Sequence, residues 1–488
     1  MNGLKKKIFD DNFVTRIYIL GYMYMALPTV IFLCGWCKLV LAIPITVALF
    51  LCLWRMIRIT HISQNVRFDY GVDKKQEIFL FFIIVFLWVL LSGISSHSYQ
   101  NEDFYWRNGM FDLLYYNKWP VIENIPNVGE RGFSYYCGFW LPATSLGKLF
   151  GYSFANNFQI IWALLGIIIF FVLIWNYVGS IKLWHVLLFI GFSGLDYIGV
   201  LLTANDISQI DLFTHLEWWT KFQYSGFTTQ LYWVFNQAIP AWVATVMIIS
   251  NKQKKHMILI LALMMINCTM PFAGLSLICL FVLLRDLLIA IKQHNIKEYV
   301  FDIISFENIL LAGSIAIVMI SFLQKKMVSS KMKIYDIHDG AWVAIFLFLF
   351  LEVYIYAVFV FRQRIKDGFL LPALLLLTVL PFIVLQDEGN LCMRASIPSL
   401  VILYLNVIRA LEKYYANNKR YFVILICILL VGSITSIHEI SRSIHNTMIL
   451  SSNDMDIKLE SKTSEEILTN DFESTNVDDN IFYRYIAK

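Results

Sequence analysis

Apolar segments of about 20 residues recur along nearly the whole chain, separated by short polar segments. This pattern is typical of an all-α polytopic membrane protein, because helices satisfy their own backbone hydrogen bonds in lipid. It predicts about thirteen transmembrane helices. They are expected at residues 17–33, 39–53, 78–93, 158–175, 184–202, 231–249, 257–288 (two spans, broken at 267–271), 304–322, 341–361, 369–385, 397–408 and 422–437.

Basic residues are concentrated in alternate loops. The N-terminal segment, the loop at residues 54–77, the sequence NKQKKH at residues 251–256 and the turn at residues 292–297 carry this excess. Because cytoplasmic loops are enriched in Lys and Arg, the pattern predicts a cytoplasmic N-terminus and an external C-terminus. A lysine group at residues 325–333, expected outside, is the exception. The first apolar run lacks a small-residue cleavage site, so the first span is expected to be retained.

Composition agrees with a membrane protein. Hydrophobic residues make up 58% of the chain and charged residues 15%, and the mean hydropathy is +0.64. The formal net charge of +4 is too small to indicate nucleic-acid binding. Among eight scattered cysteines, only Cys34 and Cys37 form a CxxC pair. No thioredoxin-like pattern surrounds them, so two small apolar residues are favoured over a redox pair or a disulfide.

The most informative segment is QNEDFYWRNGMFDLLYYNKWPV at residues 100–121, directly after a predicted span. It begins with the acids Glu102 and Asp103. A helix with one apolar face is expected next, because apolar residues recur at helical spacing from Phe104 to Tyr115. Such a helix suits the membrane interface. Two interpretations are open: a catalytic loop, or an interfacial loop whose acids simply face water.

Three regions are predicted. Residues 1–76 form a helical hairpin and a cytoplasmic loop, residues 77–438 form a transmembrane core with an outer loop at 94–156, and residues 439–488 form an external tail. The outer-loop segment SYYCGFWLPATSLGKLFG is expected to form a second interfacial or re-entrant helix. A second outer loop, at residues 203–230, is rich in polar and aromatic residues. The tail ends in the aromatic sequence NIFYRYIAK, which suggests a docked terminus.

The pattern D-x-x-x-(H/R)-x-(G/A)-x-x-x-x-L-x-x-x-x-W-P-V reads here Asp103, Arg107, Gly109, Leu114, Trp119, Pro120 and Val121. With the long acidic outer loop and its two interfacial helices, the chain resembles the GT-C glycosyltransferases, multi-span enzymes that use polyprenyl-phosphate sugar donors. The resemblance implies a GT-C-like fold, a polyprenyl-phosphate-linked sugar as donor, a glycan or lipid as acceptor, and the cytoplasmic membrane of a bacterium. Two features depart from the family pattern: two additional spans precede the acidic loop, and a glutamate adjoins the aspartate.

The chemistry of such a transfer explains why an acidic residue would be needed in this loop. A base must deprotonate the acceptor hydroxyl as the bond from the sugar to phosphate breaks, and a single displacement needs one carboxylate for this. Asp103 is the predicted base, held ionised by N–H groups at the start of its helix, and Glu102 is the second candidate. Arg394 is predicted to bind the phosphate through its planar guanidinium. An arginine that snorkels at a helix end is the alternative.

Five more residues are predicted to bind substrate: Arg107, Asn236, Gln237, Asp196 and Lys221. Asn236 and Gln237 could bind sugar hydroxyls from inside the bundle, with hydrogen bonding between helices as the alternative. Asp196 falls inside a predicted span and should face the bundle interior or a cavity, because exposing it to lipid costs about 2.5–3.5 kcal/mol.

Glu352 is the second acid expected inside a span, where a structural partner and a cavity role are equally compatible with the pattern. The sequence contains no HExxH, P-loop, GxSxG or Cys/His metal spacing. No cofactor is required by the predicted reaction. A divalent cation held by Glu102, Asp103 and Asp206 is compatible with the sequence.

The leading hypothesis is therefore a membrane glycosyltransferase that acts at the outer face with membrane lipids around it. A lipid-linked glycan flippase or other transporter is the alternative from a different class. It accounts for the acids within spans but does not need an acidic interfacial loop. A glycan polymerase, which would differ chiefly in its acceptor, is a third interpretation.

Overall fold

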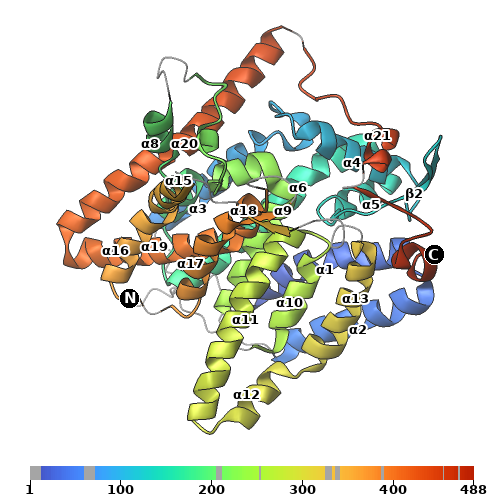
Figure 1. Ribbon diagram of the computed structural model, residues 1–488, viewed down its shortest axis with the longest axis horizontal. Coiled ribbons are helices and arrows are strands. Elements are labelled where there is room, and N and C mark those ends of the chain that lie inside the picture. The colour runs from blue at the N-terminus through green and yellow to red at the C-terminus, as the bar shows by residue number, and fades with distance from the viewer. Residues whose placement is uncertain are drawn as a thin grey trace, which may run out of the picture.

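The structure, a computed structural model, is mostly helical (Figure 1). It describes residues 13–59, 72–204, 211–251, 254–324, 332–335, 341–365, 367–385, 390–453, 455–470 and 473–488. The helices are α1 (Phe13–Trp36), α2 (Leu39–Ile59), α3 (Val72–Leu90), α4 (Phe104–Tyr116), α5 (Leu141–Phe150), α6 (Tyr152–Val178), α7 (Leu183–Gly191), α8 (Asp196–Thr203), α9 (Phe227–Ser250), α10 (Met257–Met264), α11 (Thr269–Lys292), α12 (Ile296–Ile303), α13 (Ala312–Phe322), α15 (Ala341–Leu349), α16 (Ile355–Arg362), α17 (Leu370–Val379), α18 (Asn390–Ala395), α19 (Ile397–Asn417), α20 (Lys419–Ser452) and α21 (Ser464–Thr469).

Short helical turns complete several of these elements: η1 (Ile94–Ser96), η3 (Leu216–Trp219), η4 (Lys254–His256), η5 (Glu307–Leu311), η6 (Phe350–Tyr354), η7 (Leu380–Phe382) and η8 (Phe482–Ile486). The strands are β1 (Ile122–Ile125), β2 (Gly129–Phe133), β3 (Met332–Ile334), β4 (Ile383–Leu385) and β5 (Ser474–Asn476). The expectation of an all-α chain is thus too simple, because the described residues also form two small sheets.

In the part of the chain that the structure describes, eight helical segments are long and apolar enough to cross a membrane. They are Phe13–Trp36, Leu39–Arg58, Tyr152–Val178, Leu183–Thr203, Phe227–Ser250, Thr269–Lys292, Trp342–Arg362 and Lys419–Ser452. The pair Ile296–Ile303 and Glu307–Phe322, bent by 49°, gives up to nine. These helices indicate a multi-pass integral membrane protein.

The prediction of about thirteen spans was wrong, for reasons that differ between segments. Helix α10 has eight residues, far fewer than the about 20 that cross a bilayer, and α17 with its following turn is also too short. Helix α19 has 21 residues but carries Arg409, Glu412 and Lys413. The first residues of α3 are charged, which shortens its apolar part. Hydropathy alone did not show where helices break or where charges enter them.

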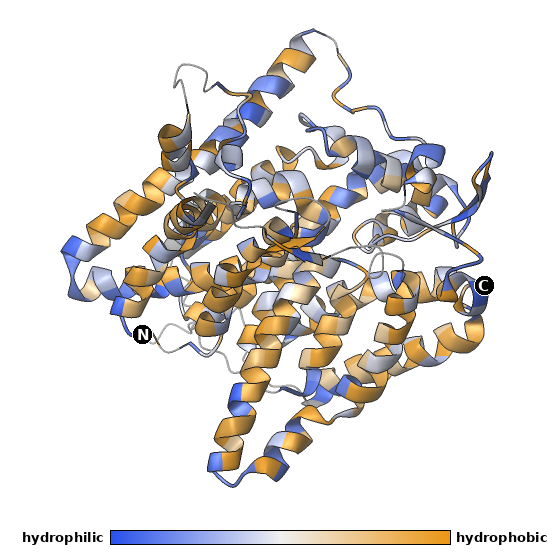
Figure 2. Ribbon diagram, in the orientation of Figure 1, coloured by the Kyte–Doolittle hydropathy of each residue, from blue (hydrophilic) through white to orange (hydrophobic). Residues whose placement is uncertain are grey.

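The spanning helices consist largely of apolar residues, as the colouring in Figure 2 shows for α1, α2 and α11. Helix α2 is the clearest case, with Val40 82% exposed and Phe50 and Ile57 well exposed. In water such a surface would be an aggregation liability, whereas a bilayer solvates it. The exposed apolar faces therefore fit lipid contact.

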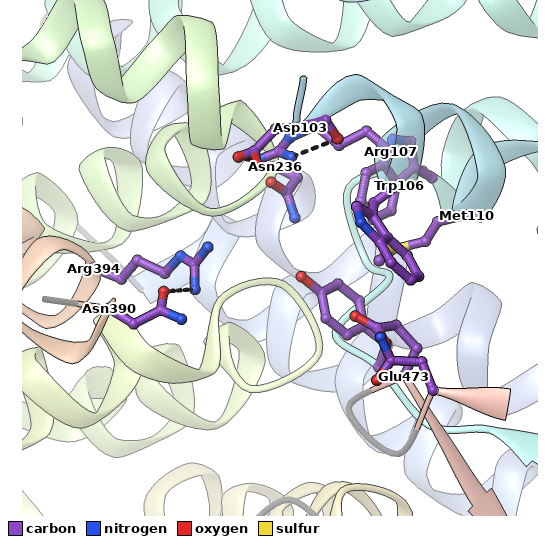
Figure 3. Close-up of a pocket in the computed structure, with 11 residues that line it drawn as sticks. Asp103, Trp106, Arg107, Met110, Asn236, Asn390, Arg394 and Glu473 are labelled. Atoms are coloured by element: carbon purple, nitrogen blue, oxygen red, sulfur yellow. Dashed lines mark hydrogen bonds and ion pairs between the residues drawn. The ribbon is translucent and has the colours of Figure 1, made fainter. Parts of the chain in front are cut away.

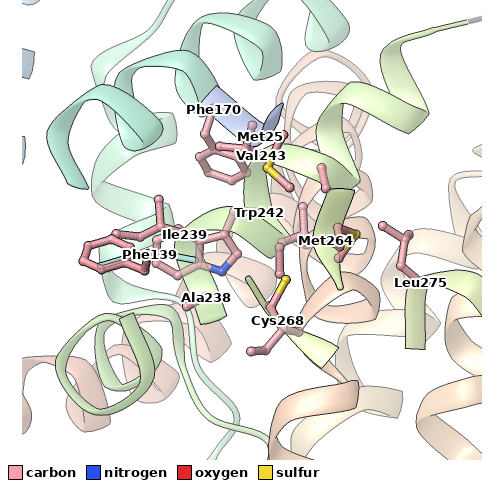
Figure 4. Close-up of a cluster of buried hydrophobic side chains, with 14 of the residues drawn as sticks. Met25, Phe139, Phe170, Ala238, Ile239, Trp242, Val243, Met264, Cys268 and Leu275 are labelled. Atoms are coloured by element: carbon pink, nitrogen blue, oxygen red, sulfur yellow. The ribbon is translucent and has the colours of Figure 1, made fainter. Parts of the chain in front are cut away.

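The centre of the bundle is α9, along which nearly every side chain is buried. Helices α6, α19, α10, α1 and α11 pack around it. Trp242 lies at the middle of this core among Met25, Phe139, Phe170 and Met264 (Figure 4). Its indole N–H donates to Gln230 Oε1 at 2.8 Å, so its one polar atom is satisfied inside the apolar core.

The outer segment, residues 94–150, and the C-terminal residues 455–488 form one layer at one end of the bundle (Figure 1). Strands β1, β2 and β5 make an antiparallel sheet in which Arg131 pairs with Asn476 and Phe133 with Ser474. Phe482 of the terminal turn is fully buried. The tail is therefore docked on the outer segment, and the expected boundary at residue 439 falls within α20.

Helix α19 defines the two ends of the bundle. It begins just after Arg394, beside the outer segment, and extends about 30 Å to Asn417. We call these the cavity end and the basic end. Lys182, Lys254, Lys292 and Arg362 all lie at the basic end, at or near the limits of spanning helices.

Candidate functional site

A cavity of about 510 Å³ opens between α4 and α18 at the cavity end. Figure 3 shows Arg394 and Asn390 on one wall, Asp103, Arg107 and Asn236 near each other on a second, and Trp106 and Met110 beyond them. Its lining comes from the outer segment, α9, α18 and the tail: Asp103, Trp106, Arg107, Met110, Tyr135, Trp140, Asn236, Asn390, Arg394, Asn470 and Glu473. Of the predicted site residues, Asp103, Arg107, Asn236 and Arg394 therefore meet here.

Asp103 stands at the start of α4, where the predicted helix is observed. Its carboxylate was expected to accept from N–H groups at the start of the helix, but it makes no such hydrogen bond. It instead accepts from Arg107 Nη2 at 2.8 Å. Spacing explains this, because residues four apart lie on the same helix face. The carboxylate is 38% exposed, so one side remains open to the cavity.

Arg107 is nine-tenths buried, and its guanidinium donates to the Asp103 carboxylate. It also donates to the main-chain oxygens of Asp103, at 3.0 Å, and of Trp233. Three of its five N–H donors are thus shared with protein acceptors, whereas Nε has no partner among the described residues. Its place suits orienting Asp103 better than binding substrate directly.

Asn236 comes from α9, where the helix is irregular at Val234 and where Pro240 cannot donate to the carbonyl oxygen of Asn236. The side chain is 2% exposed and points into the cavity, and its Oδ1 has no hydrogen-bond partner among the described residues (Figure 3). A buried amide oxygen without a donor is costly, and a ligand hydroxyl would satisfy it. Its neighbour Gln237 instead donates to Tyr136 at 3.2 Å and does not line the cavity.

Arg394 lies on α18, which rests against α11 so closely that a Cβ at Gly274 would meet the carbonyl oxygen of Ala395 at 2.1 Å. Its Nη1 donates to Asn390, and Nε has no partner in the part of the chain that the structure describes. No described carboxylate lies within ion-pair distance of it. Burial lowers its pKa, but nearby tyrosines and the carboxylates of Asp103 and Glu473 reverse this and raise it, so the guanidinium stays charged.

The wall opposite Arg394 contains residues that the sequence did not identify. Trp106 and Met110 share the inner face of α4, and Glu473 and Asn470 come from the tail. Glu473 is 5% exposed and supplies a second carboxylate to the cavity. Helical spacing could have indicated Trp106 and Met110, since both follow Asp103 on one face. Nothing local in the sequence marks Glu473.

A second cavity, of about 480 Å³, adjoins the first and shares Asp103, Asn390 and Arg394 with it. The predicted residue Lys221 lies here, exposed at the rim. The other lining residues are His215, Trp218, Thr220, Gln223, Trp233 and Met393. The site is thus a pair of cavities separated by Asp103 and Arg394.

Glu102 is exposed and lines neither cavity. Asp196 is buried away from both, where it accepts from Ser193 at 2.8 Å and from Thr435 at 3.0 Å. Glu217 and Glu352 lie close enough to Asp196 to interact electrostatically. The sequence prediction grouped Asp196 with the site because it could not show that α8 turns this side chain toward α20.

Asp206, the third ligand of the divalent site considered from the sequence, lies outside the described residues. Within the part of the chain that the structure describes, no group of three His, Cys, Asp or Glu side chains is arranged to hold a metal ion. Cys34 and Cys37, like the other six cysteines, are free thiols. The structure therefore gives these cysteines no disulfide.

No protein-family model, curated protein or solved structure matches this chain.

Proposed function

We propose that the protein is a membrane glycosyltransferase that moves a sugar from a polyprenyl-phosphate donor to an acceptor hydroxyl. One observation carries the proposal. The half-exposed carboxylate of Asp103 and the guanidinium of Arg394, which has no described carboxylate partner, line one cavity at the end of a membrane bundle. An open base and an available cation across a shared cavity are what a displacement at a sugar phosphate requires.

In the proposed reaction, the acceptor oxygen forms a bond to the anomeric carbon as the bond from that carbon to the phosphate oxygen breaks. The acceptor proton goes to the Asp103 carboxylate. The bonding electron pair goes to the phosphate, which leaves as polyprenyl phosphate and whose charge Arg394 stabilises. A single displacement of this kind inverts the anomeric centre.

Arg107 serves this scheme as a positioning residue. It holds the Asp103 carboxylate on one side and is itself held by the Trp233 carbonyl. The unpartnered Oδ1 of Asn236 would accept from a sugar hydroxyl. Glu473, on the tail side, would accept from another.

The cavity end faces outward in this proposal. Lys182, Lys254, Lys292 and Arg362 lie at the opposite end, at or near the limits of spanning helices, as expected for the cytoplasmic side. The outer segment and the tail pack together, so the structure supports placing the loop at residues 94–156 and the C-terminus on the same side. The donor would then be used from the outer leaflet.

A lipid-linked glycan transporter is the second candidate, favoured by the buried acids Asp196, Glu217 and Glu352 inside the protein. Acids at membrane depth often mark ion or substrate paths. This reading assigns no role to the Asp103 carboxylate. It predicts that translocation of a fluorescent lipid-linked saccharide in proteoliposomes survives Asp103→Asn and is lost in Asp196→Asn.

The direct test compares Asp103→Asn with Glu102→Gln in the full chain, in lipid nanodiscs. Each is supplied with synthetic prenyl-phosphate hexoses and an envelope lipid and glycan extract, and release of prenyl phosphate is followed by mass spectrometry. Asp103→Asn removes the base at constant size and should slow release by about 10²-fold or more. Glu102→Gln, which lies outside both cavities, should cost much less.

Thermal unfolding of both variants controls for misfolding. If Glu102→Gln is inactive and Asp103→Asn is not, the two acids exchange roles. If both variants release prenyl phosphate at the parental rate, the outer loop is not catalytic and the transporter becomes the better explanation.

A further inference from the structure

The second cavity has an aromatic wall that the proposed chemistry does not use. The ring of His215 stacks on that of Trp218, with centroids 4.4 Å apart and planes 7° apart. Trp233 stands nearly edge-on to both, at 4.9 Å from His215 and 6.0 Å from Trp218. Three rings therefore form a corner with two flat faces, lining a space of about 480 Å³.

Each ring of this corner is fixed in a different way. Trp233 donates its indole N–H to Glu439 at 3.1 Å, and the Arg442 guanidinium lies 5.3 Å from its ring. His215 is 8% exposed, and burial, with the charge of Arg442, lowers its pKa to about 3. It is thus an uncharged aromatic ring near neutral pH. Trp218 is 61% exposed and faces the open side.

Polar groups also line this cavity. The Nδ1 atom of the buried His215 has no hydrogen-bond partner among the residues that the structure describes. Thr220, Lys221 and Gln223 line the floor and rim. A lipid tail would offer no hydrogen bond to His215 Nδ1 and would cover polar side chains at the rim, at the cost of their desolvation. A ligand with apolar ring faces and a polar edge would satisfy both the rings and the polar atoms.

We infer that the second cavity binds a saccharide, and that this saccharide is the acceptor glycan. A sugar ring has C–H groups on its faces and hydroxyls on its edge, which match the aromatic corner and the polar rim. The saccharide would lie on the opposite side of Asp103 and Arg394 from the first cavity. Its assignment as acceptor rests on the proposed transfer reaction, whereas the affinity for saccharide does not.

The test measures binding without turnover. Saturation-transfer NMR is recorded on the full chain in nanodiscs with a panel of free mono- to tetrasaccharides of glucose, galactose, mannose, rhamnose and N-acetylhexosamines. The parental protein should saturate ring protons of at least one panel member. Trp218→Ala should weaken that binding about tenfold, because it removes an aromatic face, and Trp218→Phe should recover part of it.

Phe213→Ala is the matched control. Phe213 is 66% exposed on the same segment and lines neither cavity, so its loss should leave saccharide binding unchanged. Binding in an Asp103→Asn background should also persist. The two proposals can therefore fail separately. If Asp103→Asn retains transferase activity, the proposed reaction is wrong. If saccharide binding depends on Trp218, the saccharide site is still supported.

Three results would overturn the inference. The first is no binding by any panel member, and the second is equal binding by Trp218→Ala and the parent. The third is displacement of the saccharide by synthetic short-chain prenyl-phosphate glucose at equal occupancy, which would place the donor's sugar, and not the acceptor, in this cavity. Uridine monophosphate is run in parallel, and saturation of its protons in place of saccharide protons would indicate a nucleotide site.

Discussion

Arg394 at the cavity end differs from the cations at the basic end in its counter-ions. At the basic end, cations are matched to acids: Lys182 to Glu412 at 2.8 Å, Lys254 to Asp286 at 2.6 Å and Arg409 to Asp367 at 3.4 Å. At the cavity end, Arg394 bonds to the side chain of Asn390 and has no described carboxylate within ion-pair distance. Partly buried cations normally find counter-ions, and the exceptions require an explanation.

This contrast separates the charges that stabilise the fold from a charge that is available to bind a ligand. Within the cavity end, the same difference recurs between Arg442, which is buried against Glu439, and Arg394, which faces an open space. Paired charges of this kind fix neighbouring rings and helices. A cation next to a cavity and with no counter-ion among the described residues is available to an anion from outside the protein.

The largest effect is expected from the sidedness of these ends. A reporter fused after Lys488 should be active only outside the cytoplasm, because the tail packs on the outer segment and the opposite end is basic. Paired fusions of alkaline phosphatase and a fluorescent protein give an all-or-none readout. Cytoplasmic activity of the fusion would reverse the proposed topology and place the site inside the cell.

The next effect concerns Arg394 as a phosphate ligand. Arg394→Ala should weaken binding of a synthetic short-chain prenyl phosphate by about 2–5 kcal/mol, or about 30-fold and more, since a desolvated phosphate loses its charged donor. Arg394→Lys should restore only part, because an ammonium cannot bind in two-pronged fashion. Titration calorimetry in nanodiscs measures the affinity of each variant for the prenyl phosphate.

Arg484→Ala provides the control for Arg394, as an exposed arginine at the same end that lines neither cavity. Its affinity should equal that of the parent. Unchanged affinity in both Arg394 variants would leave Arg394 as an arginine that merely snorkels at a helix end.

Part of this picture could be predicted from the sequence because it depends on local spacing. The apolar periodicity after Asp103 gave α4, and the four-residue step to Arg107 placed the two charges on one helix face. The break between α10 and α11 followed from Asn267 and Pro271. Such features need only neighbours within a turn or two.

The rest depends on partners far away in the chain. Gly109 of the acidic-loop pattern is required because a Cβ there would meet the carbonyl oxygen of Lys462 at 2.6 Å, a packing reason that no local pattern contains. Glu473 reaches the cavity only because β5 pairs with β2. Asp196 lies away from the cavity because its carboxylate accepts a hydrogen bond from Thr435 of α20. Tertiary contacts, not spacing, decided these positions.

A smaller effect on stability should separate the two kinds of ion pair. Glu439→Gln leaves Arg442, 8% exposed, without a counter-ion, and should destabilise the fold by about 3–5 kcal/mol. Glu412→Gln breaks a pair whose Lys182 is 43% exposed, so about 1 kcal/mol or less is expected. Denaturant unfolding in micelles, followed by tryptophan fluorescence, compares them. Equal losses would show that both ends hold their charges alike.

A pH dependence of the unfolding free energy is expected from Glu217. Burial, and to a lesser degree Asp196, raises the pKa of this carboxyl to about 8, although Gln223 and the Gly226 N–H bond to it. The folded protein therefore binds a proton that the unfolded chain has released above about pH 4.3. Unfolding free energy should fall as pH rises from about 5 to 8, by at most about 1.4 kcal/mol per pH unit, and then level off.

Glu217→Gln, which is neutral at every pH, should flatten this slope between pH 6 and 8. Asp211→Asn is the control, because hydrogen bonds from Thr214 and Phe213 lower the pKa of the exposed Asp211 and its titration falls below this window. A slope that persists in Glu217→Gln would assign the titration to another buried acid of the Asp196 cluster.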